Sequence, residues 1–430
     1  MNKNSQVIEN LNNENGDVRL ESLWMLMDKI DSGEIQKPQR TNDVNNHIHT
    51  TYSFSPYSPA KAIWMAYNSG LATAGIMDHD SISGAREFIK AGQIAGMATT
   101  IGVECRVDVS KTPLVGKRIN NPDQESIAYI TMHGIPHTQI DKVKEYFSPL
   151  LQRRNNRNRL MVTKINNDIL KPFGIKMDFD TDVSVLSKYR EGGSITERHI
   201  SLALARKLIE TCGKGQKLID FLKAGLKIAI GQKMERYLLD VDNEYYEYDL
   251  LGLIKSDLVE SFYIDATDEC PDIRDIISFS KSIGAVSAYP YLGDVRDSVT
   301  GDKRSQSFED SYLDLLFRTI KDLGFNAVTY MPSRNTPEQL ERLRNLCDQF
   351  DFFQISGEDI NSPRQPFICD ALKKPEYGNL IDSTWALIGH ETLATGDLSG
   401  SMFSPDTVLA YPNLNDRIAK YKEIGLNQAR

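Results

Sequence analysis

The stretch DVNNHIHTTYSFSPYSPAKA, residues 43–62, contains two histidines separated by one residue, His47 and His49. It has the pattern of a short strand followed by a turn, and Ser58 with the proline after it is typical of a helix start. Successive side chains of a strand point to opposite faces, so both histidines point to one face and Ile48 to the other. The stretch therefore predicts a strand that presents two imidazoles together.

Short apolar segments then alternate with amphipathic helical segments, which is the pattern of successive βα units on a parallel sheet. We expect four strands in the first third of the chain, at residues 43–50, 71–78, 99–107 and 126–134. Three more helix-to-strand steps follow later and end near Tyr289, Tyr330 and Ser356. Seven strands with their helices predict an α/β fold, a seven-stranded β/α barrel.

A long charged helical stretch interrupts this alternation, so we divide the chain into five parts. They are an N-terminal helical extension (1–42), the first part of the barrel (43–137), a mainly helical insertion (138–270), the second part of the barrel (271–365) and a C-terminal extension (366–430). We expect the last part to be a structural tail that packs on the barrel, although a loop closing over the site also fits, and the spacing does not assign a role to His390.

Composition excludes several classes of protein. The 430 residues carry a net charge of −9, with 59 acidic and 50 basic side chains, which disfavours a general nucleic-acid or membrane-surface binder. The five cysteines are scattered without a C-x-x-C pair, so we expect reduced thiols. No segment has the pattern of a signal peptide or a membrane span, and we expect a cytoplasmic protein.

Candidate metal ligands gather at the ends of the predicted strands, where the loops of an α/β barrel converge. Besides the first two histidines, these are Asp78, His79, Glu104, His133 and Asp359. Each of them, taken alone, also fits a structural role as a core histidine, an ion-pair partner or a helix cap. Together at one apolar rim they would be costly to desolvate without a metal, and imidazoles with carboxylates are ligands of first-row divalent ions.

These residues lie in motifs that resemble those of the PHP (polymerase and histidinol phosphatase) domain superfamily, whose fold is a distorted seven-stranded β/α barrel. HIHTTYS is similar to the motif H-x-H-T-x-x-S, MDHDS to T-D-H-D, and GVE, which ends at Glu104, to G-x-E. GAVSAYP and SGEDINS are similar to the later motifs A-H-P and G-S-D-x-H. The resemblance covers residues 43–137 and 271–365.

The resemblance implies three metal sites that are filled to different degrees. The first would be formed by His47, His49, Glu104 and Asp359. The second would use Glu104 and His133, with Tyr289 where a histidine is expected, and the third would use His79, with Ser55 and Asn361 in place of histidines. The resemblance therefore implies one or two divalent ions per chain, zinc, manganese or iron.

The insertion and the loop after the last strand contain candidate substrate-binding residues. SITERHISLALARKLI resembles a segment with which phosphoesterases of the family bring an arginine and a histidine to the substrate phosphate, usually spaced R-x-H. Here Arg198 and His199 are adjacent and Glu197 has the arginine position, which favours His199, and a surface histidine on an amphipathic helix is the alternative. Arg364 and Tyr289 are further candidates, since an arginine there favours an anionic substrate. Four arginines between 153 and 159 fit either a phosphate-binding lip or a solvated face.

The resemblance implies a metal-dependent phosphoesterase that hydrolyses a small phosphorylated or nucleotide-like substrate by a metal-bound hydroxide. His79 would be a ligand or a proton donor, and Asp78 would orient a ligand imidazole. Two alternatives stay open. One is a degenerate barrel that serves as a binding or scaffold module, and the other is a metal-dependent enzyme that acts on an anionic substrate without phosphate.

Overall fold

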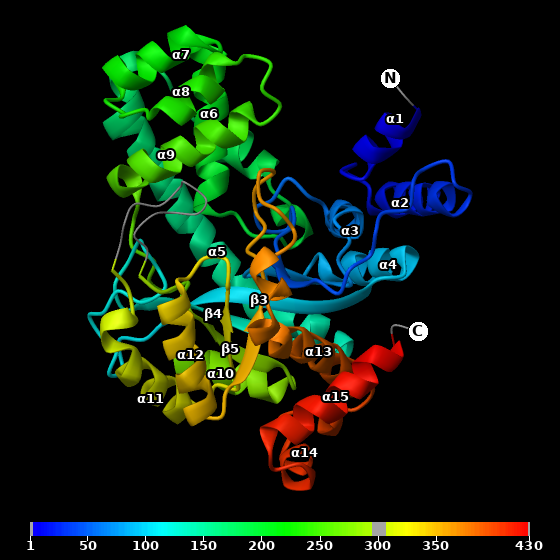
Figure 1. The fold of residues 1–430 in the computed structure, drawn as a ribbon. Helices are drawn as coiled ribbons and strands as arrows, with labels where there is room; N and C mark the ends of the chain where they lie inside the picture. The colour runs from blue at the N-terminus through cyan, green and yellow to red at the C-terminus, as the bar shows by residue number, and fades with distance from the viewer. Residues whose placement is uncertain (1–2, 295–306, 429–430) are drawn as a thin grey trace.

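In the computed structural model, which describes residues 3–294 and 307–428, seven strands form one sheet in the order β1 to β7. The strands are β1 (Val44–Ile48), β2 (Thr73–His79), β3 (Ala98–Asp108), β4 (Ile127–His133), β5 (Val286–Pro290), β6 (Ala327–Tyr330) and β7 (Phe353–Ser356). A parallel bridge between Ile48 and Ile360 joins β1 to the segment after β7. The sheet therefore curls into a nearly closed barrel, and the predicted seven-stranded α/β barrel is confirmed (Figure 1).

Strand β4 departs from the predicted parallel arrangement. It runs antiparallel to both β3 and β5, whereas the other neighbouring pairs are parallel. Residues 109–126, all of them described, contain no helix between β3 and β4, and a parallel connection normally needs one. His133, the last residue of β4, consequently pairs with Val286 at the beginning of β5.

Five helices cover the outside of the barrel: α3 (Pro59–Asn68), α4 (Ala85–Ala95), α10 (Ile273–Ser282), α11 (Leu313–Leu323) and α12 (Pro337–Gln349). They share the largest apolar core with outward-facing strand residues such as Ile48, Ile76 and Val103. The predicted start of α3 is confirmed, because the Ser58 side chain accepts a hydrogen bond from the N–H of Lys61 and a proline follows it.

Two helices at the N-terminus, α1 (Lys3–Asn10) and α2 (Gly16–Asp31), pack beside α3 and α4. Arg19 on α2 is only 2% exposed, and its guanidinium binds the carboxylate of Glu87 on α4 through both Nε and Nη2. The same guanidinium also donates to the carbonyls of Asn13 and Glu14. A buried arginine that makes four hydrogen bonds of this kind fixes the extension to the barrel.

Between β4 and β5 the chain builds a helical body above the strands (Figure 1). Its helices are α5 (Ile140–Lys164), α6 (Glu197–Cys212), α7 (Gln216–Asp220), α8 (Gln232–Leu239) and α9 (Tyr246–Phe262). Residues from Met161 to Phe262 form an apolar core of their own, while Phe147 at the beginning of α5 belongs to the barrel core. Helix α5 thus connects the two bodies. None of the helices in the described chain has the length and apolarity to cross a bilayer.

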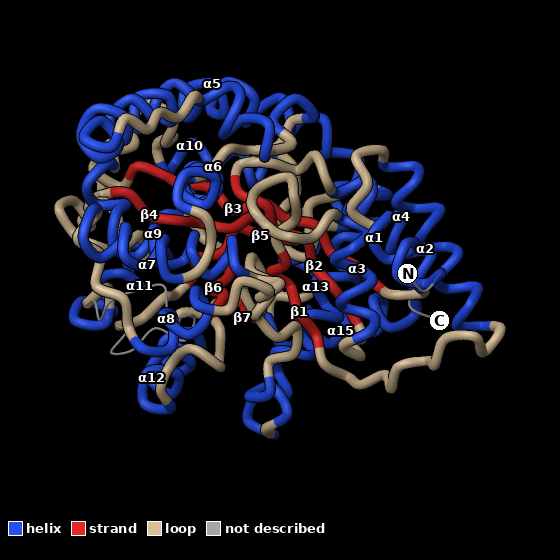
Figure 2. The backbone as a smooth tube through the Cα atoms, turned by 90° about the horizontal axis from the view of Figure 1, so that it is seen from above, coloured by secondary structure: helices blue, strands red, loops and turns tan. Residues whose placement is uncertain are grey.

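The C-terminal part fills the barrel from the side opposite to this insertion (Figures 1 and 2). It contains α13 (Gly378–Gly396), α14 (Pro405–Ala410) and α15 (Leu414–Gln428), and Ala386 and Leu387 of α13 pack against inward-facing residues of β5, β6 and β7. His390 is completely buried: the Met402 N–H donates to its Nδ1, so its Nε2 must donate to the Gly134 carbonyl, each at 3.0 Å. This histidine is structural.

Candidate metal centre

Strand β1 presents its two predicted histidines to the interior of the barrel. His47 and His49 are 8% and 1% exposed, while Ile48 between them packs in the outer core. The His49 N–H donates to the carbonyl of Ile360, and the Ile360 N–H donates to the carbonyl of His47, at 3.0 and 3.1 Å. The two imidazoles therefore lie at the seam where the barrel closes.

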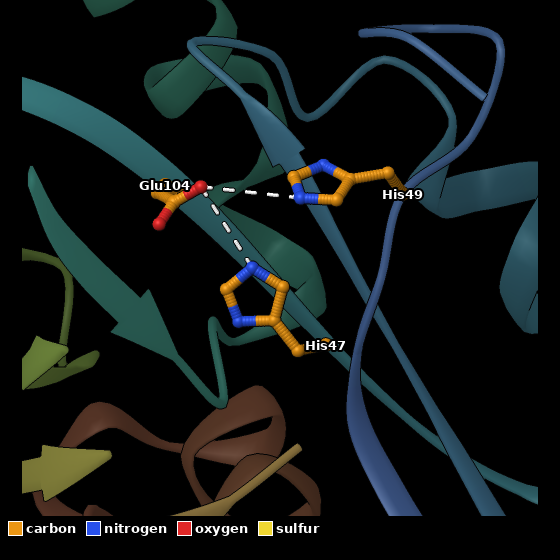
Figure 3. A group of neighbouring side chains, drawn as sticks. All are labelled: His47, His49 and Glu104. Carbon is orange, nitrogen blue, oxygen red and sulfur yellow. Dashed lines mark ion pairs between the residues drawn. The ribbon is translucent and has the colours of Figure 1, made fainter. Parts of the chain in front are cut away.

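Glu104 on β3 lies among three histidines. Its Oε2 is 3.7 Å from Nε2 of His47, 3.9 Å from Nε2 of His49 and 3.0 Å from Nδ1 of His79; the first two contacts are drawn in Figure 3. Within residues 3–294 and 307–428, no other three His, Cys, Asp or Glu side chains bring their ligand atoms within 4.8 Å of one another as His47, His49 and Glu104 do. Two imidazole nitrogens and a carboxylate oxygen are a donor set for a first-row divalent ion.

Asp359 joins this group from the loop after β7. Its Oδ1 lies 3.1 Å from Nε2 of His49 and accepts a hydrogen bond of 2.7 Å from Nδ2 of Asn361. Gly357 allows this loop to approach, because a Cβ at that position would lie 2.7 Å from the backbone nitrogen of His47. The fold thus brings together the four residues that the resemblance implies for a first metal site.

Burial and neighbouring charges determine the protonation of the two carboxylates, Glu104 and Asp359. Burial would raise the pKa of Glu104, but the charges of His79 and His47 beside its carboxylate outweigh burial, and the pKa lies well below its usual value. Burial likewise opposes ionisation of Asp359, but its surroundings, which include the charges of His47 and Arg198, outweigh burial, so that this pKa is also well below the ordinary range. Two ionised carboxylates among imidazoles favour the binding of a cation.

Two buried imidazole nitrogens without hydrogen-bond partners indicate whether a metal ion fits this centre. His133 is 1% exposed, burial lowers its pKa to about 3, and its Nε2 has no hydrogen-bond partner among the described residues. Nε2 of His49 is also without one, since it is close to Asp359 but not aligned for a hydrogen bond. An unpaired buried polar atom costs about 1–3 kcal/mol. Coordination of a divalent ion would give these nitrogens a partner and remove this cost, so the residues of the centre fit a metal ion.

The two residues at the end of β2 lie on opposite sides of the strand. His79 points toward Glu104, its ring centroid is 4.6 Å from that of His49, and its side chain is 23% exposed. Asp78 is buried beneath the loop after β1, where Thr50 and Ser53 donate hydrogen bonds to it. Asp78 therefore reaches His49 through Ser53, whose hydroxyl lies 3.2 Å from Nδ1 of that ring.

Comparisons with known proteins identify the family and the fold. A search against protein-family models matches residues 45–325 to the PHP domain. The chain belongs to the PHP domain family. The fold is similar to the crystal structure of a presumed metal-dependent phosphoesterase from Bifidobacterium adolescentis, with a TM-score of 0.52 and 19% identity over 79% of this chain and 94% of that chain. An amidohydrolase from Chromobacterium violaceum, solved with sulfate and without metal, has a TM-score of 0.49 and 17% identity over 76% and 89% of the two chains. A search of curated proteins found no match.

Tyr289 lies away from the centre of this PHP domain. Glu104 pairs with Thr131, and Thr131 with Ala288, so Ala288 shares the inner face with Glu104 while Tyr289 takes the outer face. The tyrosine is 2% exposed, packs in the outer core and donates a hydrogen bond of 3.0 Å to Glu309. The structure therefore does not support our expectation that Tyr289 contacts the substrate.

The insertion brings one of its two candidates toward the metal centre. Arg198, at the beginning of α6, lies close enough to lower the pKa of Asp359 by its charge. His199 is 2% exposed, its Nδ1 accepts the N–H of Thr196 at 3.0 Å, and its ring packs edge-on against Phe54. It is thus neither a surface histidine nor free at Nδ1, because it caps its own helix.

Arg364 binds a carboxylate of the chain itself. Its Nε and Nη2 donate to the two oxygens of Asp249 on α9, at 2.7 and 2.8 Å. The guanidinium also lies over the rings of Tyr237 and Tyr245. We expected Arg364 to bind an anionic substrate, whereas in the structure its guanidinium is paired with Asp249, and the pair fastens the loop that carries Asp359 to the insertion.

Two of the four arginines on α5 form a buried cluster that we call the arginine joint, which fits neither a phosphate-binding lip nor a solvated face. Arg154 and Arg157 are 3% and 6% exposed, whereas Arg153 and Arg159 are exposed. The members of the arginine joint are Arg106, Arg154, Arg157, Asp80, Glu197 and Glu269. Helical periodicity could have predicted that Arg154 is buried, since it falls on the same face of the helix as the apolar residues Phe147, Leu151 and Met161.

Proposed function

We propose that this PHP domain is a metal-dependent hydrolase that cleaves a phosphoester of a small anionic substrate. The observation that supports the proposal is the convergence of His47, His49, Glu104 and Asp359, with His133 beside them and two unpaired buried nitrogens. We propose zinc, manganese or iron as the metal, one or two ions per chain.

A divalent ion bound to these residues would polarise a phosphoryl oxygen and lower the pKa of a water molecule. The chain would supply the remaining functions. Because Nδ1 of His79 contacts Glu104, its Nε2 is the nitrogen that can hold a proton for the leaving oxygen. Arg198, whose charge acts on Asp359, is the residue that we propose for binding the negative charge of the substrate.

Metal content and phosphatase activity measured together test this proposal. Protein purified without chelator is analysed for metals, and hydrolysis of an aryl phosphate is followed with added Mn²⁺ or Zn²⁺, for the wild type and Asp359→Ala. His137→Gln is the control, since His137 lies outside the centre and binds Glu391. We expect at least one ion per chain and metal-dependent hydrolysis in the wild type and control, and loss of both in Asp359→Ala.

The other outcomes separate the alternatives. Stoichiometric metal without hydrolysis of any phosphoester tested would indicate a substrate without phosphate. A wild type that takes up no metal would contradict the proposal and favour a binding or scaffold role for the barrel.

A further inference from the structure

A short chain of hydrogen bonds leads from the metal centre to Asp78. Nδ1 of His49 lies 3.2 Å from Oγ of Ser53, and that hydroxyl lies 2.6 Å from Oδ1 of Asp78. All three side chains are at most 1% exposed. Ser53 is therefore the only residue between this carboxylate and the imidazole in the chain of contacts, and solvent does not compete for its hydroxyl.

Counting protons fixes the direction of these hydrogen bonds. Asp78 already accepts the N–H of Thr50 at 2.7 Å and the Thr50 hydroxyl at 2.6 Å. A distance of 2.6 Å is typical of a hydroxyl that donates to a carboxylate, so Ser53 uses its single proton toward Asp78. Its oxygen can then only accept from His49, which places a proton on Nδ1 of that ring.

A proton on Nδ1 determines what Nε2, on the other side of the His49 ring, can bind. In a neutral imidazole with a proton on Nδ1, Nε2 carries a lone pair. That atom lies 3.1 Å from Oδ1 of Asp359 and 3.9 Å from Oε2 of Glu104. A lone pair facing two carboxylates is unfavourable unless a cation lies between them, so the hydrogen bonds at Nδ1 prepare Nε2 for metal coordination.

We propose that Ser53 is a positioning residue of the metal centre, which fixes the tautomer and the orientation of His49 by linking its Nδ1 to Asp78. The inference rests on the proposed function, because it assumes that the centre binds a metal. It extends the expected role of Asp78, since the carboxylate acts on His49 through a serine and not by direct contact. Thr50 binds both oxygens of Asp78 and so holds this carboxylate in place.

Calorimetric titration of Mn²⁺ into metal-free protein provides the first test. Ser53→Ala removes the link and Ser53→Thr keeps the hydroxyl. Ser280→Ala is the matched control, because Ser280 is also buried at 1% exposure but its hydroxyl donates to the Ala285 carbonyl beside α10. Partners that orient a ligand histidine typically contribute 10–100-fold in metal affinity, so we expect a loss of about that size in Ser53→Ala only.

Nitrogen NMR of ¹⁵N-histidine-labelled, metal-free protein at alkaline pH provides the second test and does not require metal binding. We expect His49 to be protonated at Nδ1 in the wild type and in Ser53→Thr, and to become a mixture of tautomers in Ser53→Ala. An Nε2–H tautomer in the wild type, or equal Mn²⁺ affinity of Ser53→Ala and the wild type, would overturn the inference. A wild type that binds no Mn²⁺ would instead contradict the proposed function, and the tautomer would still decide the role of Ser53.

Discussion

Glu269→Gln, which removes one negative charge from the arginine joint between the barrel and the insertion, should destabilise the protein strongly. The Glu269 side chain is 4% exposed and accepts hydrogen bonds from Nη2 of Arg106 at 2.6 Å and from Nε and Nη2 of Arg157 at 2.8 and 2.9 Å. Glutamine keeps the shape but removes the charge, so that three guanidinium groups share two carboxylates, Glu197 and Asp80. Removing one partner of a buried ion pair costs about 3–5 kcal/mol, and we expect the free energy of unfolding to fall by that amount.

Urea denaturation followed by far-UV circular dichroism measures this loss, because the insertion is mainly helical. Asp180→Asn is the matched control: Asp180 also binds an arginine of α5, Arg159, through two hydrogen bonds, but the side chains are 61% and 49% exposed. An exposed pair is screened by water, so its loss should leave the midpoint almost unchanged. If Glu269→Gln costs no more than Asp180→Asn, the joint does not hold uncompensated buried charge and the reasoning is wrong.

Three further predictions concern pH, metal content and helix packing. Burial would raise the pKa of Glu269, but Arg106 and Arg157 hold it below its usual value. Its contribution to stability is therefore present above the unfolded pKa, about 4.3, and is lost as the pH falls through the folded pKa, so acid denaturation of wild type and Glu269→Gln should converge there. Tyr289→His should leave the metal content of the purified protein unchanged, since this position faces the outer core; an added ion per chain would contradict that placement. Gly389→Ala should lower the free energy of unfolding by about 1–3 kcal/mol, because a Cβ there would clash with the backbone carbonyl of Tyr421 in α15. Gly396→Ala is the control and should leave the thermal unfolding midpoint unchanged, because the space around Gly396 is open.

Strand periodicity and motif order were enough to predict the barrel, and the residues that the resemblance implies for a first metal site lie close together in it. The i and i+2 spacing of His47 and His49 placed both on one face, and Glu104 was at the correct level of the third strand. The antiparallel direction of β4 was missed, although residues 109–126 contain the loop-forming sequence KTPLVGKRINNPDQES, which cannot supply a crossover helix.

Other features could not be read from local sequence, because they depend on partners far along the chain. The face of Tyr289 was undetermined, since both faces of a barrel strand are buried and alternation alone does not identify the inner one. The partner of Arg364 is Asp249, 115 residues away, and a single charge in a loop gives no indication of it. Ser53 is part of the quoted motif, but its link to Asp78 became visible only when β1 and β2 were placed side by side.

The way in which the C-terminal part closes the barrel has a consequence for biosynthesis. The amide of Asn46, next to His47, donates to the Ser356 carbonyl and to the Thr384 hydroxyl, both at 2.8 Å, and the amide of Asn45 donates to the Phe367 carbonyl. A ribosome therefore makes β1 more than 300 residues before the segments that its asparagine side chains bind. The nascent chain carries both histidines early, but the candidate metal centre lacks these contacts until α13 has emerged, so a metal in the final geometry would be acquired late in synthesis.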